Sequence, residues 1–308
     1  MANDLSVVVC TYNRASLLAE CLQSLAMQTL AAWRFEVLIV DNNSNDGTQI
    51  VAEIFCQECP NFRVVCELEQ GLSHARNRGW KEARGDYVAY IDDDGLAERD
   101  WCERILASFE DVTPPPWAVG GKILPRYTDV PPAWFSDCLE TRSWGDSASF
   151  LKPPVSKYGF SGANMAFPRK LLEDFGGFSS HLGMVGEKVR MGEDTELFLR
   201  LSASQHDLFW YDPLIIVNHW TSIKQFSLRP RFFRSFQGGR SHYYFESCKE
   251  ETNFKTFLSA FYQLSKGGTC FFKPSGEKLA HVVRAVERAL HQFGLYFESI
   301  VAKRKISA

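Results

Sequence analysis

The first third of the chain alternates short apolar runs with segments of helical periodicity. The runs are rich in valine and isoleucine and too short for helices, which predicts buried strands at Leu5–Cys10, Phe35–Val40, Phe62–Cys66 and Tyr87–Ile91. Between them, leucines recur at helical spacing from Leu17 to Leu25, and further helices are expected at about 48–56, 73–83 and 98–109. Successive strand–helix units are typical of a doubly wound α/β layer on a parallel sheet.

The middle of the chain is less regular. A strand is expected at Trp117–Ile123, but paired prolines interrupt every periodic pattern between residues 125 and 158. Long loops inside a compact domain usually carry function rather than scaffold. From Arg229 onward the pattern becomes helical, and apolar positions from Leu279 to Phe293 mark one face of a long amphipathic helix. This pattern indicates a helical region that packs on the α/β part.

Composition and charge exclude several classes of protein. The 308 residues are 45% hydrophobic, and 37 acidic against 34 basic side chains leave a formal charge of −3, so we expect a folded protein without a nucleic-acid partner. The nine cysteines are scattered, and Cys56 and Cys59 lack the second pair that a zinc site needs. Asp4 stands where a signal peptide is positively charged, and no apolar stretch reaches the ~20 residues that span a bilayer. We therefore expect a cytoplasmic protein.

Polar clusters follow three of the predicted strands directly, at Thr11–Arg14, Asp41–Asp46 and Asp92–Asp94. The carboxyl ends of parallel strands lie at one edge of the sheet, where ligands bind, so these clusters should converge. Asn, Asp, Ser and Thr are also favoured in turns and helix caps, and Asp46 with Thr48 fits that simpler interpretation.

Three consecutive carboxylates at residues 92–94 repel one another unless a cation or hydrogen-bond donors offset their charge. Hard oxygen ligands suit Mg²⁺ or Mn²⁺, which keep several waters and bridge to substrate phosphates. The triple aspartate therefore predicts a divalent metal that binds together with a nucleoside diphosphate.

The order and spacing of these motifs resemble the family 2 glycosyltransferases. The matching segments cover residues 5 to about 245 and comprise Val7–Arg14, Val40–Ser44, Asp46–Thr48, Gly71 with Ala75–Asn77, Tyr90–Asp94, Ser161–Asn164, Gly176–Phe178, Gly192–Asp194 and Asn218–His219. The resemblance implies a GT-A-type fold, which is a Rossmann-like, doubly wound, mainly parallel sheet, here with a C-terminal helical extension. It also implies inverting transfer of a sugar from a nucleoside diphosphate sugar, with Mn²⁺ or Mg²⁺ as cofactor.

The resemblance assigns the donor nucleotide and the metal to named residues. The nucleotide-binding positions are Thr11, Tyr12, Asn13, Arg14, Asp41, Asn43, Arg76, Asp92 and Asp93. A carboxylate at Asp41 accepts the N–H of uracil, thymine or guanine, which cytosine and adenine lack. UDP is the first candidate for the donor nucleotide, and GDP and dTDP are the others. Asp94 is the first choice as metal ligand, Asp92 holds the ribose or a metal-bound water, and His219 matches a histidine that completes the metal shell in some relatives.

The same resemblance assigns the chemistry. Inversion needs one carboxylate to take the acceptor's proton, and Asp194 matches the family's base, with Glu193 beside it to orient it. Acidic residues are also favoured at a helix N-terminus, and both interpretations suit Asp194. Trp134, Gly162 and Asn164 are the predicted substrate and acceptor contacts. Arg231 and Arg234 lie three residues apart and are predicted to bind the diphosphate, although a solvated helix face has the same pattern.

These assignments predict a catalytic domain over residues 1–228, with a nucleotide-binding half at about 1–115 and an acceptor-binding half at about 116–228, followed by a helical region over 229–308. The chain lacks the Q-x-x-R-W motif and the membrane helices of processive synthases, so a single addition to a glycan or lipid-linked acceptor is expected. The helix at Val282–Phe293, with basic residues 303–305, allows peripheral contact with the inner face of a membrane.

The sequence supports two alternative functions less well. A sugar-nucleotide nucleotidyltransferase should carry a glycine-rich phosphate loop after the first strand, and residues 10–14 contain no glycine. An inactive carbohydrate-binding relative would have lost one of the carboxylates at 41, 92, 94 or 194, and all four are present.

Overall fold

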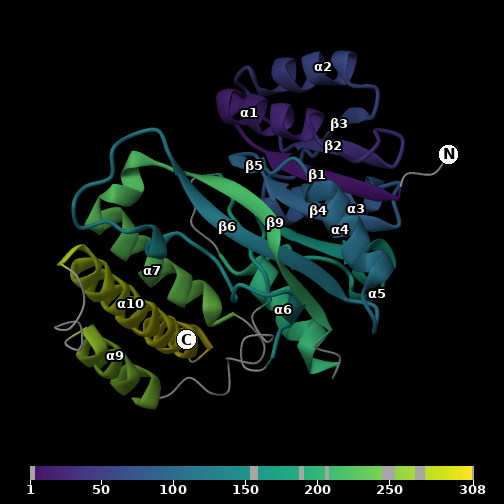
Figure 1. The fold of residues 1–308 in the computed structure, drawn as a ribbon. Coiled ribbons are helices and arrows are strands. Elements are labelled where there is room, and N and C mark those ends of the chain that lie inside the picture. Colours follow the sequence, from purple (N-terminus) through teal and green to yellow (C-terminus); the bar gives the residue numbers. More distant parts are fainter. Residues whose placement is uncertain are drawn as a thin grey trace. The chain divides into compact units, whose positions relative to one another are not determined.

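The computed structural model describes residues 4–152, 159–186, 191–204, 208–244, 254–267 and 275–306 (Figure 1). The chain forms two units. Unit 1 comprises residues 1–124, 142–181 and 193–220, and unit 2 comprises residues 125–141, 182–192 and 221–308.

Unit 1 is built on one mixed β-sheet. Its described strands are β1 (Leu5–Thr11), β2 (Phe35–Asp41), β3 (Phe62–Cys66), β4 (Tyr87–Asp92), β5 (Gly95–Ala97), β6 (Ala118–Tyr127), β7 (Ser149–Phe150), β8 (Met165–Pro168) and β9 (Phe209–Thr221). They follow the order β3-β2-β1-β4-β8-β6-β9-β5, with β7 beside β9. β1 to β4 are parallel, whereas β8 joins β4 in the antiparallel direction. Thr11 pairs with Asp41 and Cys10 with Asp92, so the three polar strand ends lie at one level.

Helices cover both faces of this sheet because its strands are apolar on both sides. The helices of unit 1 are α1 (Ala15–Ala26), α2 (Thr48–Glu58), α3 (Leu72–Glu82), α4 (Trp101–Asp111), α5 (Arg169–Phe175) and α6 (Glu193–Ala203). Val7 and Val9 face a core with α1, α2 and α4, whereas Val8 faces a core with α3, α5 and α6. The alternation of successive side chains along a strand produces this three-layer arrangement.

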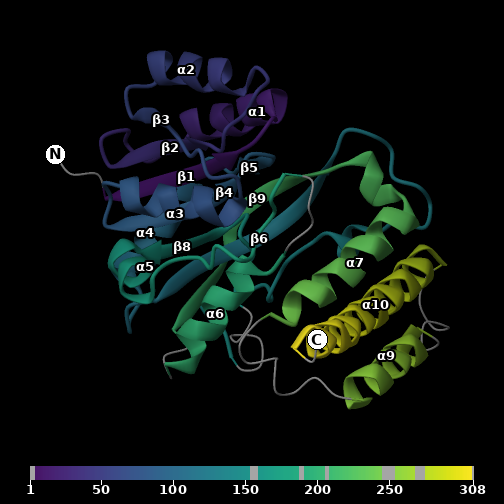
Figure 2. The ribbon, with the colours of Figure 1, turned by 180° about the vertical axis from the view of Figure 1, so that it is seen from behind.

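Unit 2 is largely helical. It contains η1 (Asp137–Leu139), η3 (Ile223–Phe226), α7 (Leu228–His242), α9 (Phe254–Gly267) and α10 (Ser275–Ile306), and α10 packs against both α7 and α9 (Figure 2). Glycines allow the close approach of α7 and α10: a Cβ on Gly239 would lie 1.9 Å from the backbone oxygen of His291. Among the described residues, none of the helices combines the length and the apolar character that a membrane crossing requires. The side chains of residues 303–305 lie outside the described residues.

The strands expected in the first third are confirmed, and the helices differ at their ends by a few residues. The main difference is at residues 95–100. The helix expected from about residue 98 begins at Trp101, because Gly95–Ala97 instead forms β5 and pairs with β9. Pairing with a strand more than 100 residues away determines the structure of this segment, and the local sequence pattern does not reveal that pairing.

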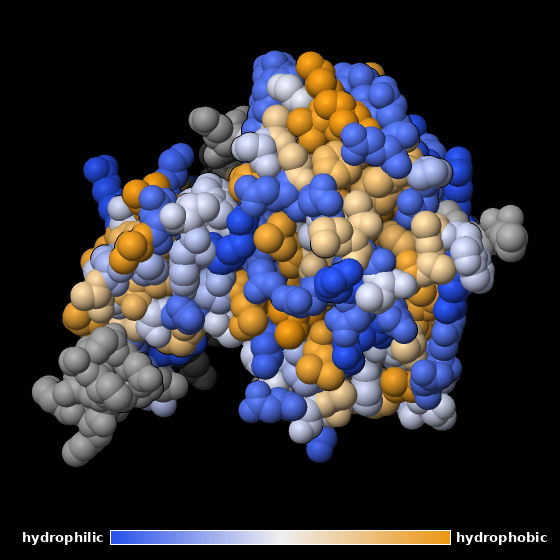
Figure 3. All heavy atoms as spheres, turned by 45° about the horizontal axis from the view of Figure 1, so that its top comes forward, coloured by the Kyte–Doolittle hydropathy of each residue, from blue (hydrophilic) through white to orange (hydrophobic). Residues whose placement is uncertain are grey.

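Hydrophobic side chains at the surface are interspersed with charged and polar ones (Figure 3). On α2, for example, Ile50 and Ile54 are 63% and 46% exposed, and Gln49 and Glu53 on the same helix are hydrogen-bonded to each other. Exposed apolar residues of this kind are common on folded proteins, because apolar atoms contribute more than half of their accessible surface.

Candidate active site

Two loops at the carboxyl edge of the sheet are joined by side-chain hydrogen bonds. The N–H of Asn13 donates to Ser44 Oγ at 3.0 Å, and Asn13 Oδ1 accepts the N–H of Asn45 at 2.8 Å. The N–H of Arg14 donates to Thr48 Oγ1 at 3.0 Å. Asn13 has a φ of 52°, a left-handed conformation that asparagine tolerates better than most residues. The loop after β1 and the loop after β2 therefore form one continuous surface.

The predicted nucleoside positions lie on that surface. Asp41 is 4% exposed, and its Oδ1 accepts the N–H of Ser44 at 3.1 Å. Its strand partner Thr11 is also buried. Tyr12 is half-buried beside them, and Asn43 is exposed with a φ of 65°. A buried carboxylate next to a buried hydroxyl suits the polar edge of a ligand.

The predicted metal ligands converge from two distant segments. Ligand atoms of Asp92, Asp94 and His219 all lie within 4.8 Å of one another. Nε2 of His219 lies 3.0 Å from Asp94 Oδ1 and 3.7 Å from Asp92 Oδ2. Burial opposes protonation of this imidazole, but its pairing with the two carboxylates outweighs burial and raises the pKa of His219 to about 10. Asp92 and Asp94 therefore stabilise the positive charge of a protonated His219.

These residues also fit a divalent metal by their chemistry. Asp94 Oδ1 is buried and accepts no hydrogen bond of good geometry within the described residues, although it faces His219. A buried carboxylate oxygen beside an imidazole and a second carboxylate is a donor set that suits an Mn²⁺-type or Mg²⁺-type ion that also binds phosphate. Asp92, Asp94 and His219 would hold that ion.

Arg14 lies against the same aspartates. Its Nη1 is 3.0 Å from Asp93 Oδ1 and 2.7 Å from Asp94 Oδ2, and 46% of its side chain is exposed. Burial raises the pKa of Asp93 to about 7, and the charge of Arg14 opposes that rise. The guanidinium therefore offsets part of the repulsion within the triple aspartate while it still reaches solvent.

Arg76 lies beside Asp92, another of the predicted nucleotide-binding residues. Its side chain is 3% exposed, with Nη1 2.6 Å from Glu193 Oε1 and Nη2 3.3 Å from Asp92 Oδ1. The guanidinium lies over the Phe178 ring, 5.6 Å from its centroid. Both of its terminal nitrogens thus contact protein carboxylates. Its pairing with Glu193 could not be predicted from the local sequence pattern, because 117 residues separate the two.

The two acidic residues at the start of α6 differ in their surroundings. Glu193 is buried; burial raises its pKa, which the Arg76 charge opposes. Asp194 is only half-buried, and its Oδ2 accepts the N–H of Gly162 at 2.9 Å while Oδ1 accepts the N–H of Thr195 at 2.7 Å. Of the two carboxylates, Asp194 is therefore the one oriented by backbone donors and open to a second molecule.

Asn164 has a structural environment instead of the predicted substrate contact. It is 1% exposed, its Oδ1 accepts from Trp101 Nε1 at 2.9 Å, and its Nδ2 donates to the backbone oxygens of Lys122 and Ile215 at 3.0 and 2.9 Å. These bonds use both amide hydrogens, so the side chain ties α4 to β6 and β9 rather than reaching a ligand.

Trp134, Arg231 and Arg234 belong to unit 2. Trp134 packs against Phe135 within a small apolar cluster. Arg231 is buried, and its guanidinium forms ion pairs with Glu140 and Glu287, whereas Arg234 is exposed. The carboxylate partners of Arg231 place it in the packing of α7 and α10, away from the predicted diphosphate role.

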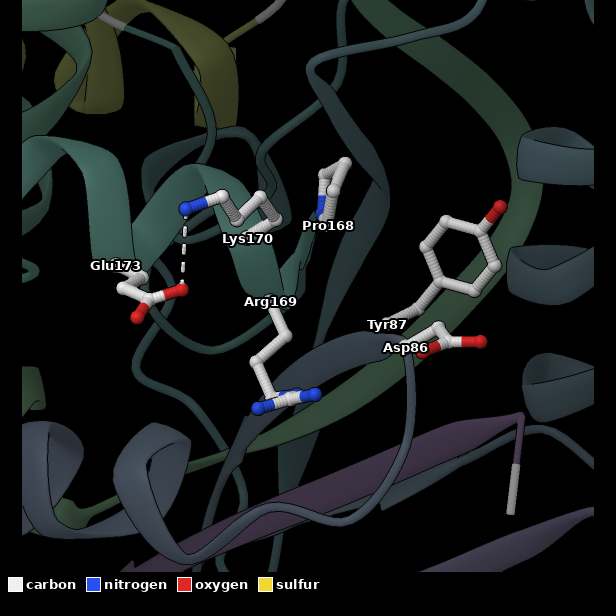
Figure 4. Close-up of a pocket in the computed structure, with 6 residues that line it drawn as sticks. All are labelled: Asp86, Tyr87, Pro168, Arg169, Lys170 and Glu173. Atoms are coloured by element: carbon white, nitrogen blue, oxygen red, sulfur yellow. Dashed lines mark hydrogen bonds and ion pairs between the residues drawn. The ribbon is translucent and has the colours of Figure 1, made fainter. Parts of the chain in front are cut away.

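A surface pocket of about 350 Å³ lies at the other end of β4 (Figure 4). Tyr87 begins β4 and lines this pocket, while Asp92 ends the strand, so the two are roughly 16 Å apart. Lys170 points toward Glu173 across its rim, 3.3 Å from the carboxylate (Figure 4). The pocket is separate from the carboxylate cluster.

The family follows from a comparison with known sequences. The model of Glycosyl transferase family 2 matches residues 6–176, which is more than half of the chain. The chain therefore belongs to this family. A glucosyl-dolichyl phosphate glucuronosyltransferase of Haloferax volcanii is 29% identical over 243 residues, which cover 77% of this chain and 75% of the relative.

Solved structures show the same fold. The mannosyltransferase PcManGT of Pyrobaculum calidifontis, solved with GDP-Man and Mn²⁺, has a TM-score of 0.59 at 20% identity, covering 100% of this chain and 76% of that one. TarS of S. aureus, residues 1–349 with UDP, has a TM-score of 0.53 at 17% identity, covering 98% and 92%. The expected GT-A-type α/β fold is confirmed.

Proposed function

We propose that this glycosyltransferase moves one sugar from a nucleoside diphosphate sugar to a hydroxyl of a glycan or lipid-linked acceptor, with inversion at the anomeric carbon. The observation that carries the proposal is the convergence of Asp92, Asp94 and His219, with ligand atoms within 4.8 Å of one another, in the same unit as the backbone-oriented carboxylate of Asp194. The Haloferax relative, named for a dolichyl phosphate substrate, supports a lipid-linked acceptor.

The donor half of the site is assigned to the ends of β1, β2 and β4. Asp41 would accept the imide or amide N–H of the base, which suits UDP, GDP or dTDP, and the partly exposed Arg14 would reach the phosphates. A divalent ion held by Asp92, Asp94 and His219 would neutralise the charge that develops on the departing diphosphate. Structural neighbours solved with GDP-Man and Mn²⁺ or with UDP support this assignment.

The acceptor half depends on Asp194. The acceptor oxygen forms its bond to the anomeric carbon on the face opposite the diphosphate, while the bond from that carbon to the phosphate oxygen breaks and its electron pair leaves with the diphosphate. The carboxylate of Asp194 takes the hydroxyl proton. Hydrogen bonds from the N–H groups of Gly162 and Thr195 hold both of its oxygens in place before the acceptor arrives.

The test is a thermal-shift panel of UDP, GDP, dTDP, CDP and ADP, each with Mn²⁺ and with EDTA. A ligand present at 100 times its dissociation constant stabilises the native state by about 2.7 kcal/mol, which a shift in the unfolding midpoint reports without knowledge of the acceptor. We expect a metal-dependent shift with one of the first three nucleotides. The absence of any shift would refute the proposed donor site, and an anomeric NMR coupling that shows retention in the product would refute the inversion.

A further inference from the structure

One buried guanidinium joins the two halves of the candidate site. Arg76 projects from α3 and places Nη2 3.3 Å from Asp92 Oδ1 and Nη1 2.6 Å from Glu193 Oε1. Asp92 belongs to the metal-ligand group at the end of β4, and Glu193 begins α6, directly before Asp194. The side chain is 3% exposed, so solvent does not screen these ion pairs strongly.

The guanidinium of Arg76 is closely packed. Phe178 lies under its face, and Tyr90 donates its hydroxyl to the backbone oxygen of Arg76 at 3.2 Å. On the other side, a Cβ on Gly162 would lie only 2.1 Å from Nη2, so the guanidinium packs directly against the Gly162 backbone. The same glycine donates its N–H to Asp194 Oδ2 at 2.9 Å.

Arg76 therefore reaches the neighbourhood of Asp194 by two routes. One runs through the ion pair to Glu193, the residue before Asp194, and the other runs through the backbone of Gly162, which donates to Asp194. The planar fork of arginine contacts two carboxylates at once, which the single ammonium of lysine does not reproduce.

We propose that Arg76 is a positioning residue: it fixes the carboxylate of Asp194 relative to the metal-ligand carboxylate of Asp92, and it does not itself bind the donor nucleotide. This inference rests on the proposed function. It differs from the role that the sequence motif implied for Arg76, because both terminal nitrogens already contact protein carboxylates within a buried site. The motif position is then explained by the geometry of the reaction centre rather than by nucleotide binding.

The test uses Arg76→Lys, which keeps the charge and removes the fork. We expect kcat to fall about 100-fold, because a displacement of about 1 Å at a reaction centre costs that much. The dissociation constant of the nucleotide that shifts the wild type, measured by calorimetry with Mn²⁺, should stay within about threefold. Glu193→Gln should act in the same direction, and the double variant should be little worse than Arg76→Lys, because both changes break the same contact.

Arg63→Lys is the matched control. Arg63 pairs with the buried Glu36 at 2.7 Å between β3 and β2, so its change tests the loss of an arginine fork away from the site. This variant should lower the unfolding midpoint and leave kcat unchanged. Glu193→Gln carries the test alone if Arg76→Lys does not fold, since Arg76 keeps Asp92 as a partner in that variant.

Three outcomes would overturn the inference. An unchanged kcat in folded Arg76→Lys and Glu193→Gln would show that the guanidinium of Arg76 does not position the carboxylate of Asp194. A nucleotide dissociation constant raised tenfold or more, with kcat preserved, would show that Arg76 binds the donor. A wild type that neither binds a nucleotide nor transfers a sugar would refute the proposed function and this inference with it. The wild-type measurements thus separate failure of the proposed function from failure of the inference about Arg76, which only the variants test.

Discussion

Replacement of Asp194 by asparagine separates its chemical role from its structural one. The carboxylate accepts the N–H of Gly162 through Oδ2 at 2.9 Å and the N–H of Thr195 through Oδ1 at 2.7 Å. Asparagine keeps the shape of the side chain but offers only one oxygen. Its amide nitrogen must therefore face one of the two backbone donors, and the group no longer takes a proton.

The two effects have different sizes. Loss of a general base lowers a rate by about 100-fold to 10,000-fold, which corresponds to about 3 to 5 kcal/mol of barrier. Loss of one backbone hydrogen bond costs about 1 to 3 kcal/mol of folding stability. Asp194 is half-buried, so water can replace the lost partner and the lower end of that range applies. We expect a folded, moderately destabilised protein with almost no transfer activity.

The assay measures kcat at saturating donor and acceptor, together with the dissociation constant of the nucleotide with Mn²⁺. Nucleotide affinity should change less than about threefold, because the change leaves the donor site intact. Asp174→Asn is the control: it makes the same chemical change on α5 beside Lys170, where the side chain is 53% exposed. Retention of more than a tenth of kcat in Asp194→Asn would refute its role as base, and a collapse of nucleotide affinity would assign it to the donor site.

Three further changes test the metal site, the ion pairs and the core. Asp94→Ala removes a carboxylate from the ligand group, so the nucleotide-induced thermal shift should lose its dependence on Mn²⁺; an unchanged dependence contradicts the assignment. Burial of Glu36 is outweighed by hydrogen bonds from Arg63 and Ser6, which lower its pKa below 4.5, so its contribution is present at neutral pH and lost as the pH falls below that value. The difference in unfolding free energy between wild type and Glu36→Gln, measured by urea denaturation, should therefore shrink between pH 7 and about pH 3, and a constant difference would be inconsistent with this. Leu22→Ala empties a fully buried position under the sheet and should cost about 2 to 5 kcal/mol in the same denaturation, whereas a loss below about 1 kcal/mol would show that the core collapses around it.

The sequence was informative where local pattern decides structure. Strands such as Phe35–Asp41 are buried at every position, so an apolar run sufficed to predict them, and the polar residues that end them had to meet at one edge. The sequence was less informative where residues far away in the chain determine the surroundings of a side chain. Arg76 was expected to face the nucleotide, and only the fold brings Glu193 to it. Asn164 matched a motif position, yet bonds to Trp101 and two backbone oxygens make it part of the framework.

The metal-ligand geometry follows from strand packing more than from loop shape. β5 pairs with β9 so that Gly95 lies opposite His219, and the N–H of Trp220 donates to the backbone oxygen of Asp94 at 2.9 Å. A Cβ on Gly95 would lie 2.9 Å from a side-chain carbon of Val217 and 3.0 Å from one of Ile91, so a larger residue there would force these side chains to shift. Because the same pairing fixes the backbone of Asp94 and of His219, the sheet brings their side chains together.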